Sequence, residues 1–215
     1  MTQPDFERAK QYALERLTRD LSPDYHYHSL WHTQEDVVPA AERLAEKEGI
    51  TGESLLLLRT AAWFHDVGCI VQRAEHEAIG VGIVLTVLPG LGYSRDQLRI
   101  IQGMIMATRL PQTPHTLLDQ ILADADLDAL GREDFVARNT ALRAELAAFG
   151  VFWTDQDWRE NQINFLREHH YFTAVARSLR QAQKQLNLEA LLKKEAEGEA
   201  GPEKVKALTP QSPFQ

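Results

Sequence analysis

The stretch LLLLRTAAWFHDVG, residues 55–68, decides the fold class of this chain. Residues 55–64 form a long and nearly unbroken apolar run, which predicts a central helix that is buried on most of its sides. Two adjacent polar residues, His65 and Asp66, follow this run, and Gly68 is expected to end the helix. Burying a charged aspartate there is costly unless it is paired or bound to a cation.

The sequence on both sides of this stretch also has the pattern of helices. We expect helices over about 4–20, 29–48, 51–67, 74–88, 94–108, 117–130, 133–148, 156–167 and 173–192. No period-2 strand pattern and no internal repeat occurs, so we predict an all-α helical bundle with a single domain over residues 1–192. Residues 193–215 are rich in Lys, Glu, Gly and Pro, and we expect a frayed helix end and a disordered tail there.

The charge of the chain bears on its partners. Its 23 basic and 31 acidic residues give a net charge of -8. An acidic chain repels polyanions, so we expect no nucleic-acid polymer as a partner, whereas a small phosphate ester remains compatible. With one cysteine, no signal pattern and no apolar run of roughly 20 residues, we expect a cytoplasmic protein without a membrane partner. The sequence leaves the oligomeric state open.

Two segments carry histidines in positions that suit a metal. In YHYHSLWHT, residues 25–33, His28 and His32 are four residues apart and share a helical face. A half-exposed aromatic helix start explains this segment equally well. The doublet His65-Asp66 offers imidazole and carboxylate, the donors that suit Mn, Fe, Co, Ni or Zn, and Mg less well. A hydrogen-bonded pair that caps a turn is the simpler interpretation of the doublet alone.

Other polar residues stand in otherwise apolar surroundings. The segment ILADADL, residues 121–127, places Asp124 and Asp126 in an apolar helix opening, where N-capping explains one aspartate more easily than two. The pair His76-Glu77 is a weak signal by itself. Arg109 and Arg132 are candidates to neutralise a phosphate, although each taken singly is more simply a solvated arginine.

The order of these pieces resembles the signature H…HD…D of the HD superfamily of metal-dependent phosphohydrolases. His32 stands at the first histidine, His65-Asp66 at the doublet and Asp126 at the last aspartate. The segments YHSLWHT (27–33), PQTP (111–114) and DADLDALGR (124–132) are similar to one bacterial branch, whose members are mostly called predicted phosphohydrolases. The resemblance covers residues 25–185 and implies an HD-domain helical bundle.

The resemblance implies one divalent metal ion, which is Mn, Fe, Co, Ni, Mg or Zn. It assigns His32, His65, Asp66 and Asp126 as the ligands, with Asp124 as the alternative to Asp126. A second ion would need further donors, for which His76 and His115 are the candidates.

The resemblance also implies a reaction. A metal-activated water would attack the phosphoester of a small molecule, with a nucleotide as the expected class and with monoesters and diesters both open. Asp66 would take part as a metal ligand, His76 and Glu77 or else His28 would assist catalysis, and Arg109 and Arg132 would bind the substrate. Two alternatives stay open: a di-iron oxygenase of the same fold, and a non-catalytic signalling or binding domain that retains a metal site.

Overall fold

The computed structural model describes residues 3–198, which contain helices and no β-strand. The all-α prediction is therefore confirmed. The longer helices are α1 (Phe6–Asp20), α2 (Val38–Lys47), α3 (Gly52–Phe64), α4 (His76–Val87), α5 (Arg95–Thr108), α6 (Leu117–Asp126), α7 (Phe135–Ala148), α8 (Asp155–Glu168) and α9 (Ala174–Gly198). A π-helical turn, η1 (His32–Val37), precedes α2, and three short 3₁₀ turns are η2 (Val67–Ile70), η3 (Leu88–Leu91) and η4 (Asp128–Gly131).

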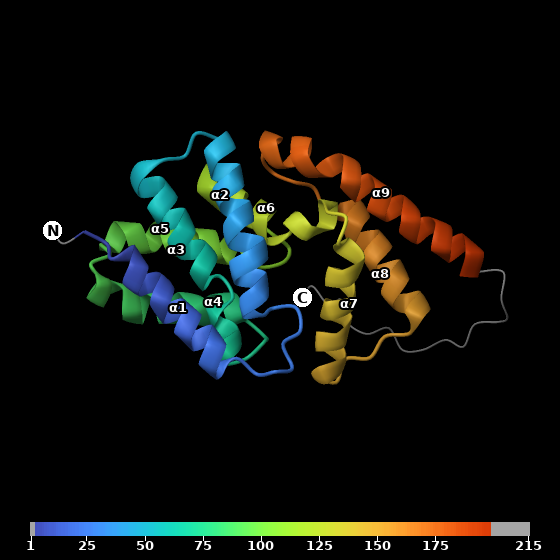
Figure 1. The fold of residues 1–215 in the computed structure, drawn as a ribbon, viewed down its shortest axis with the longest axis horizontal. Helices are drawn as coiled ribbons and strands as arrows, with labels where there is room; N and C mark the ends of the chain where they lie inside the picture. The colour runs from blue at the N-terminus through green and yellow to red at the C-terminus, as the bar shows by residue number, and fades with distance from the viewer. Residues whose placement is uncertain (1–2, 199–215) are drawn as a thin grey trace.

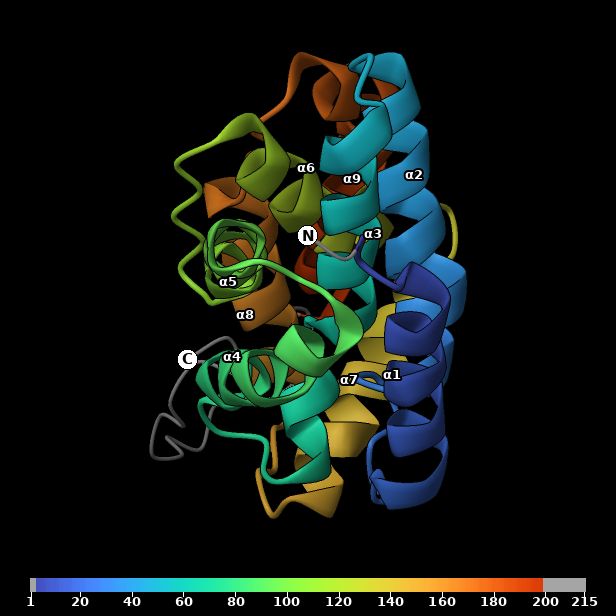
Figure 2. The same ribbon diagram turned by 90° about the vertical axis from the view of Figure 1, so that its left-hand side faces the viewer.

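Helix α3 lies at the centre of the larger group of helices, as its apolar sequence predicts. It packs against α1, α2, α5 and α6, and its residues 60–64 are all buried. In Figure 1 the gold-to-red helices α7, α8 and α9 lie on the right of α2, on the side away from α3. The turned view in Figure 2 shows α3 between α2 and α5. The main apolar core therefore surrounds the end of α3 that carries the His-Asp doublet.

The structure differs from the sequence prediction at the end of this central helix. Helix α3 ends at Phe64, and the chain turns through His65 and Asp66 into η2, rather than continuing to Gly68. Gly68 instead permits a close approach of α4. A Cβ atom at Gly68 would lie 1.9 Å from the carbonyl oxygen of His76, so no other residue fits there without moving α4.

Two other helix ends differ from the prediction. Helix α6 begins after a capping box formed by Thr116 and Asp119 and ends at Asp126, and η4 replaces its expected continuation to Leu130. The two aspartates near its end therefore lie in its last turn and not at its opening. Helix α9 continues through Gly198, beyond the expected end at 192, and the rest of the expected tail lies outside the described residues.

The described part of the chain contains no helix with both the length and the apolar character needed to cross a bilayer.

Candidate metal centre

Four side chains from three elements meet beside the end of α3. His32 is the first residue of η1, His65 and Asp66 follow α3, and Asp126 is the last residue of α6. Nε2 of His32 lies 3.2 Å from Oδ1 of Asp126, and Nε2 of His65 lies 3.2 Å from Oδ2 of Asp66. The donor atoms of His32, His65 and Asp66 all lie within 4.8 Å of one another. The structure thus brings together the four residues that the signature assigned to the metal.

Two donor atoms of the cluster lack hydrogen-bond partners within residues 3–198, as expected if they bind a cation. Nε2 of His65 and Oδ2 of Asp66 are buried and have no hydrogen-bond partner among the described residues, although they lie close together. Buried polar atoms in proteins are nearly always paired, so both atoms lack a partner that a metal ion would supply. Nδ1 of His65 faces the carbonyl oxygen of Ala62 at 2.8 Å and donates its hydrogen there, which leaves the Nε2 lone pair to bind the ion.

The charges in the cluster favour protonated imidazoles and deprotonated carboxylates. Burial lowers the pKa of His32, but contacts with Asp126, Asp36 and Asp66 outweigh burial and raise it to about 9. Burial raises the pKa of Asp126, but its contacts with His32 and His65 outweigh that effect and lower it to about 2. Without a metal the protons on the histidines balance the carboxylates. Metal binding must therefore release protons.

A second layer of charged residues supports His32. Nδ1 of His32 lies 3.5 Å from the buried carboxylate of Asp36, one turn further along η1. Arg132 Nη1 donates to Oδ1 of Asp36 at 2.5 Å, and the same guanidinium also binds Asp134. Carboxylates that orient metal-binding histidines recur in metal sites. The sequence prediction missed Asp36, although its position four residues after His32 places both on one helical face.

Asp124 has a different environment from Asp126. Its carboxylate accepts hydrogen bonds from the backbone N–H groups of Phe172 and Thr173 at 2.7 and 2.8 Å, and from Oγ1 of Thr173 at 2.8 Å. Both of its oxygens are therefore used to hold the start of α9. Between the two aspartates that the sequence left open, the geometry favours Asp126 as the ligand.

The pair His76-Glu77 opens α4 and lies directly beside the cluster. Nε2 of His76 lies 3.2 Å from Oδ1 of Asp66 and 3.5 Å from Oε1 of Glu77. The close packing of α4 on Gly68 fixes this approach. Burial lowers the pKa of His76, but its contacts with Asp66 and Glu77 outweigh burial and raise it to about 9. His76 is thus charged at neutral pH in the metal-free chain.

His28 lies beside the cluster, 5.5 Å ring to ring from His76, and a residue distant in the sequence holds its side chain. Its Nδ1 lies 2.5 Å from Oε1 of Glu145, whose other oxygen accepts the backbone N–H groups of Tyr27 and His28 at 2.9 Å. Glu145 belongs to α7, and its side chain is fully buried. The sequence prediction missed Glu145, because nothing local marks a contact across 117 residues.

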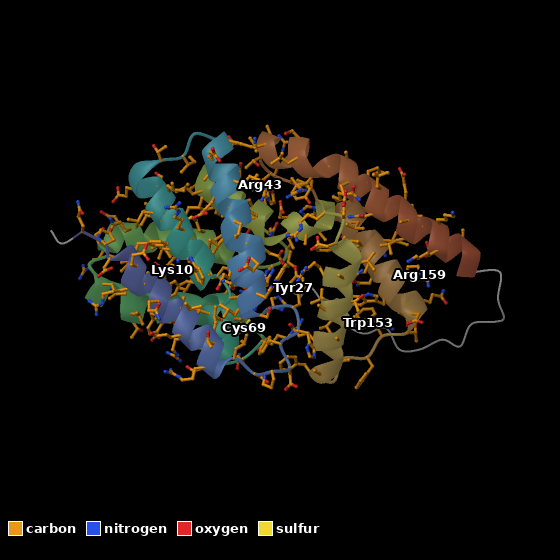
Figure 3. All side chains as sticks on the ribbon, in the orientation of Figure 1. Lys10, Tyr27, Arg43, Cys69, Trp153 and Arg159 are labelled. Carbon is orange, nitrogen blue, oxygen red and sulfur yellow. The ribbon has the colours of Figure 1, made fainter. Side chains whose placement is uncertain are left out.

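A cavity of about 460 Å³ opens onto the cluster. Its polar side includes Asp66, His76, Glu77, Asp126 and His28. Tyr27, labelled between α2 and α7 in Figure 3, also lines it. The rest of its wall combines apolar side chains near η4, α7 and α8 with polar ones: the apolar set is Leu127, Ala129, Leu130, Phe135, Leu142 and Phe165, and the polar set includes Arg73, Arg109, Arg138, Asn139 and Gln162.

Of the other residues predicted for the site, some line the cavity and others do not. Arg109 lines the cavity, where it pairs with Glu75 at 2.7 Å, whereas Arg132 does not line it and binds Asp36 instead. His115 is exposed and lies neither in the cluster nor in the cavity wall. Cys69 is a buried neighbour, since Asp66, Cys69 and His76 offer donor atoms within 4.8 Å of one another.

Comparisons with known proteins give a domain match and similar folds among solved structures. The family model of the HD domain matches residues 35–130, which include His65, Asp66 and Asp126. A solved structure of a protein from Lactobacillus plantarum is similar, with a TM-score of 0.66 and 22% identity, over 91% of this chain and 97% of that one. A structure described as a predicted HD superfamily hydrolase, from an uncultured Thermotogales bacterium, is also similar. Its TM-score is 0.59 and its identity is 20%, over 91% of this chain and 94% of that one. No curated protein matches the sequence.

Proposed function

We propose that this chain, of which residues 35–130 match the HD domain, is a metal-dependent phosphohydrolase of the HD superfamily that cleaves a small phosphoester, with a nucleotide as the favoured substrate class. One observation carries the proposal: buried donor atoms of His32, His65 and Asp66 converge within 4.8 Å beside a cavity that Asp66 lines. The solved structure called a predicted HD superfamily hydrolase supports the same class of activity.

We assign four residues to hold one divalent ion: His32, His65, Asp66 and Asp126. A bound ion of this kind supplies activation of a water molecule and neutralisation of charge on the phosphoryl group. Two imidazoles and two carboxylates leave coordination positions free on an octahedral ion, and the cavity adjoins Asp66 and Asp126. A water and a phosphate oxygen can therefore both reach the site.

His76 is the residue we assign to proton transfer. Its Nδ1–H donates to the carbonyl oxygen of Arg73 at 2.9 Å, so Nε2 is the nitrogen that faces Asp66 and the cavity. In the metal-free chain, burial lowers the pKa of His76, but contacts with Asp66 outweigh burial and raise it to about 9, so Nε2 carries a proton there at neutral pH. It can give this proton to the leaving oxygen. Glu77 orients the ring, and His28 lies 5.5 Å away, ring to ring, as the second candidate.

Arg109 is the residue we assign to the substrate phosphate. It is a cation in the cavity wall close to the cluster, and its partner Glu75 is exposed and easily displaced. Arg132 has no such role in this proposal, because its guanidinium already donates hydrogen bonds to Asp36 and Asp134. The net charge of -8 favours a small ester over a nucleic-acid polymer.

The proposal is tested by a panel of phosphomonoesters and phosphodiesters, assayed with Mn, Mg, Co and Ni. We expect metal-dependent turnover of at least one small ester, and loss of that turnover in His65→Ala with the helical circular dichroism retained. His115→Ala is the matched control, since this exposed histidine lies outside the cluster. Absence of turnover with every ester and every ion would leave a non-catalytic helical domain as the better account.

Metal stoichiometry decides the remaining alternatives. Two ions per chain would place the second beside Asp66, His76 and Cys69, whose donor atoms also lie within 4.8 Å of one another. A coloured protein with two irons would favour the oxygenase chemistry. His115, one of the two spare histidines available for such chemistry, lies outside the cluster.

A further inference from the structure

We propose that the wall of the cavity formed by α7 and α8 recognises a flat heterocycle with an adjacent hydrogen-bond donor and acceptor, such as a nucleobase, through Asn139 and Gln162. We call this surface the α7–α8 wall and define it by Phe135, Asn139, Leu142, Gln162 and Phe165, which all line the cavity. The inference rests on the proposed function only in placing the phosphate of the same ligand at the metal centre.

The spacing of these residues puts them on facing sides of two helices. Residues 135, 139 and 142 lie on one face of α7, and residues 162 and 165 lie on one face of α8. The short connection through Trp153 reverses the direction of the chain between the two helices, as Figures 1 and 3 show.

Apolar clusters lie on either side of the two amides. Leu142 and Leu146 cluster with Trp158 near the connection, whereas Phe135 clusters with Leu166 further away from it. Asn139 lies about one turn from Leu142 towards Phe135, and Gln162 lies one turn from Trp158 towards Leu166. Along each helix the amide therefore lies between the two apolar clusters, and both amides line the same cavity.

The hydrogen bonding of these amides is incomplete. Nε2 of Gln162 and Oδ1 of Asn139 are buried and have no hydrogen-bond partner among the described residues. Gln162 is only 2% exposed, so bulk water does not satisfy it. A buried amide atom without a partner is destabilising, and such a pair is more stable with a ligand that supplies the missing bonds. The terminal torsion of either side chain is soft, so each amide can turn its unpaired atom towards the cavity.

The chemistry of the wall selects the kind of ligand. Oδ1 of Asn139 accepts one hydrogen bond and Nε2 of Gln162 donates one, which matches a planar edge with adjacent N–H and carbonyl or ring-nitrogen groups. Phe135, Leu142 and Phe165 around them suit the flat apolar faces of such a ring. A polyol is disfavoured, because its hydroxyl groups would lose water against these side chains without new partners.

This wall lies outside the part of the chain that matches the family model. The match ends at residue 130, and α7 begins at Phe135. The metal ligands His65, Asp66 and Asp126 lie inside the match. Substrate selection by the α7–α8 wall is thus a property of the segment that follows the matched domain.

Nucleosides without phosphate test the wall separately from the reaction. Adenosine, guanosine, cytidine and uridine are titrated by calorimetry into the full chain as purified, and into Gln162→Leu, Gln162→Glu and Asn139→Leu. Asn164→Leu is the matched control, because Asn164 is an exposed amide of the same helix outside the cavity wall. The variants are expected to fold, since an apolar side chain in place of an unpaired buried amide removes no bond.

We expect at least one nucleoside to bind at millimolar concentration or below. The dissociation constant should rise at least tenfold in Gln162→Leu and in Asn139→Leu, and stay within twofold in Asn164→Leu. Gln162→Glu exchanges a donor for an acceptor and should change which nucleoside binds best. No binding of any nucleoside, or binding that the three wall variants leave unchanged, would overturn the inference. Hydrolysis of p-nitrophenyl phosphate by the wild type tests the proposed function independently of either result.

Discussion

Oδ1 of Asp126 lies 3.2 Å from Nε2 of His32, although 94 residues separate the two in the chain. Asp126 ends α6 and His32 begins η1, so the packing of α6 against η1 and α2 creates the contact. A carboxylate in the last turn of a helix is opposed by the helix dipole, and the nearby imidazoles compensate for it. This contact joins the first and last elements of the metal centre.

The two aspartates of α6 should respond differently to removal. Asp126→Ala should abolish metal binding and turnover, while urea unfolding of the metal-free chain shows that the fold is retained. Asp124→Ala should keep the metal but lower the free energy of unfolding by about 2–4 kcal/mol, because three hydrogen bonds at the start of α9 are lost. Loss of metal in Asp124→Ala with retention in Asp126→Ala would reverse our assignment.

Arg132 should act on the metal and not on the substrate. We expect Arg132→Leu to weaken metal binding by about 10–100-fold, because Asp36 then no longer holds His32 in place. With saturating metal, the KM for a phosphoester should stay near the wild-type value. A raised KM with unchanged metal affinity would instead assign Arg132 to the phosphate, as the sequence alone suggests.

Arg109 should show the opposite behaviour. Replacing it by methionine removes one of the arginines that line the cavity and should raise KM by about tenfold, with metal content unchanged. Arg99→Met removes an exposed arginine paired with Asp96 away from the cavity and serves as the control. Equal KM values for the two variants would remove Arg109 from the substrate site.

His169 lies outside the metal site, and it should make the free energy of unfolding depend on pH. Burial, together with the charges of Lys184 and His170, lowers the pKa of His169 from 6.5 to about 3. The unfolded chain then binds more protons between these values, so this contribution to stability is complete above pH 6.5 and is lost as the pH falls towards 3. The free energy of unfolding falls by at most about 1.4 kcal/mol per pH unit through this residue.

The measurement is urea unfolding at neutral pH and at about pH 5. His169→Phe should lose less stability on acidification than the wild type, because the ring that must stay neutral is gone. His170→Phe replaces an exposed neighbour and should behave like the wild type. An identical pH dependence in His169→Phe and the wild type would show that His169 is not responsible.

The sequence predicts most of the fold because its helices carry their own signals. The apolar run that ends in Phe64 marks the central helix, and Ser94, which caps α5 with a capping box to Gln97, marks the start of another. The end of α3 could not be predicted, because it depends on the approach of α4 to Gly68. Such a contact between distant backbone segments leaves no periodic pattern in either segment.

The same distinction applies to the site. The residues that we propose as metal ligands follow a signature of short motifs, so the sequence could assign them before their contacts were known. Glu145, Asn139 and Gln162 are single polar residues in ordinary helices, and only the tertiary packing gives them a role. Arg132 stands in a segment similar to the bacterial branch, but the sequence could not show that Asp36 would bind it.

The most direct test of the central claim is the metal content of the purified chain and of Asp66→Ala, measured by elemental analysis beside phosphate release. We predict about one divalent ion per wild-type chain, little or none in a folded Asp66→Ala, and phosphate release only with the ion present. A folded wild-type chain that binds no ion, and that no added ion activates, would contradict the account.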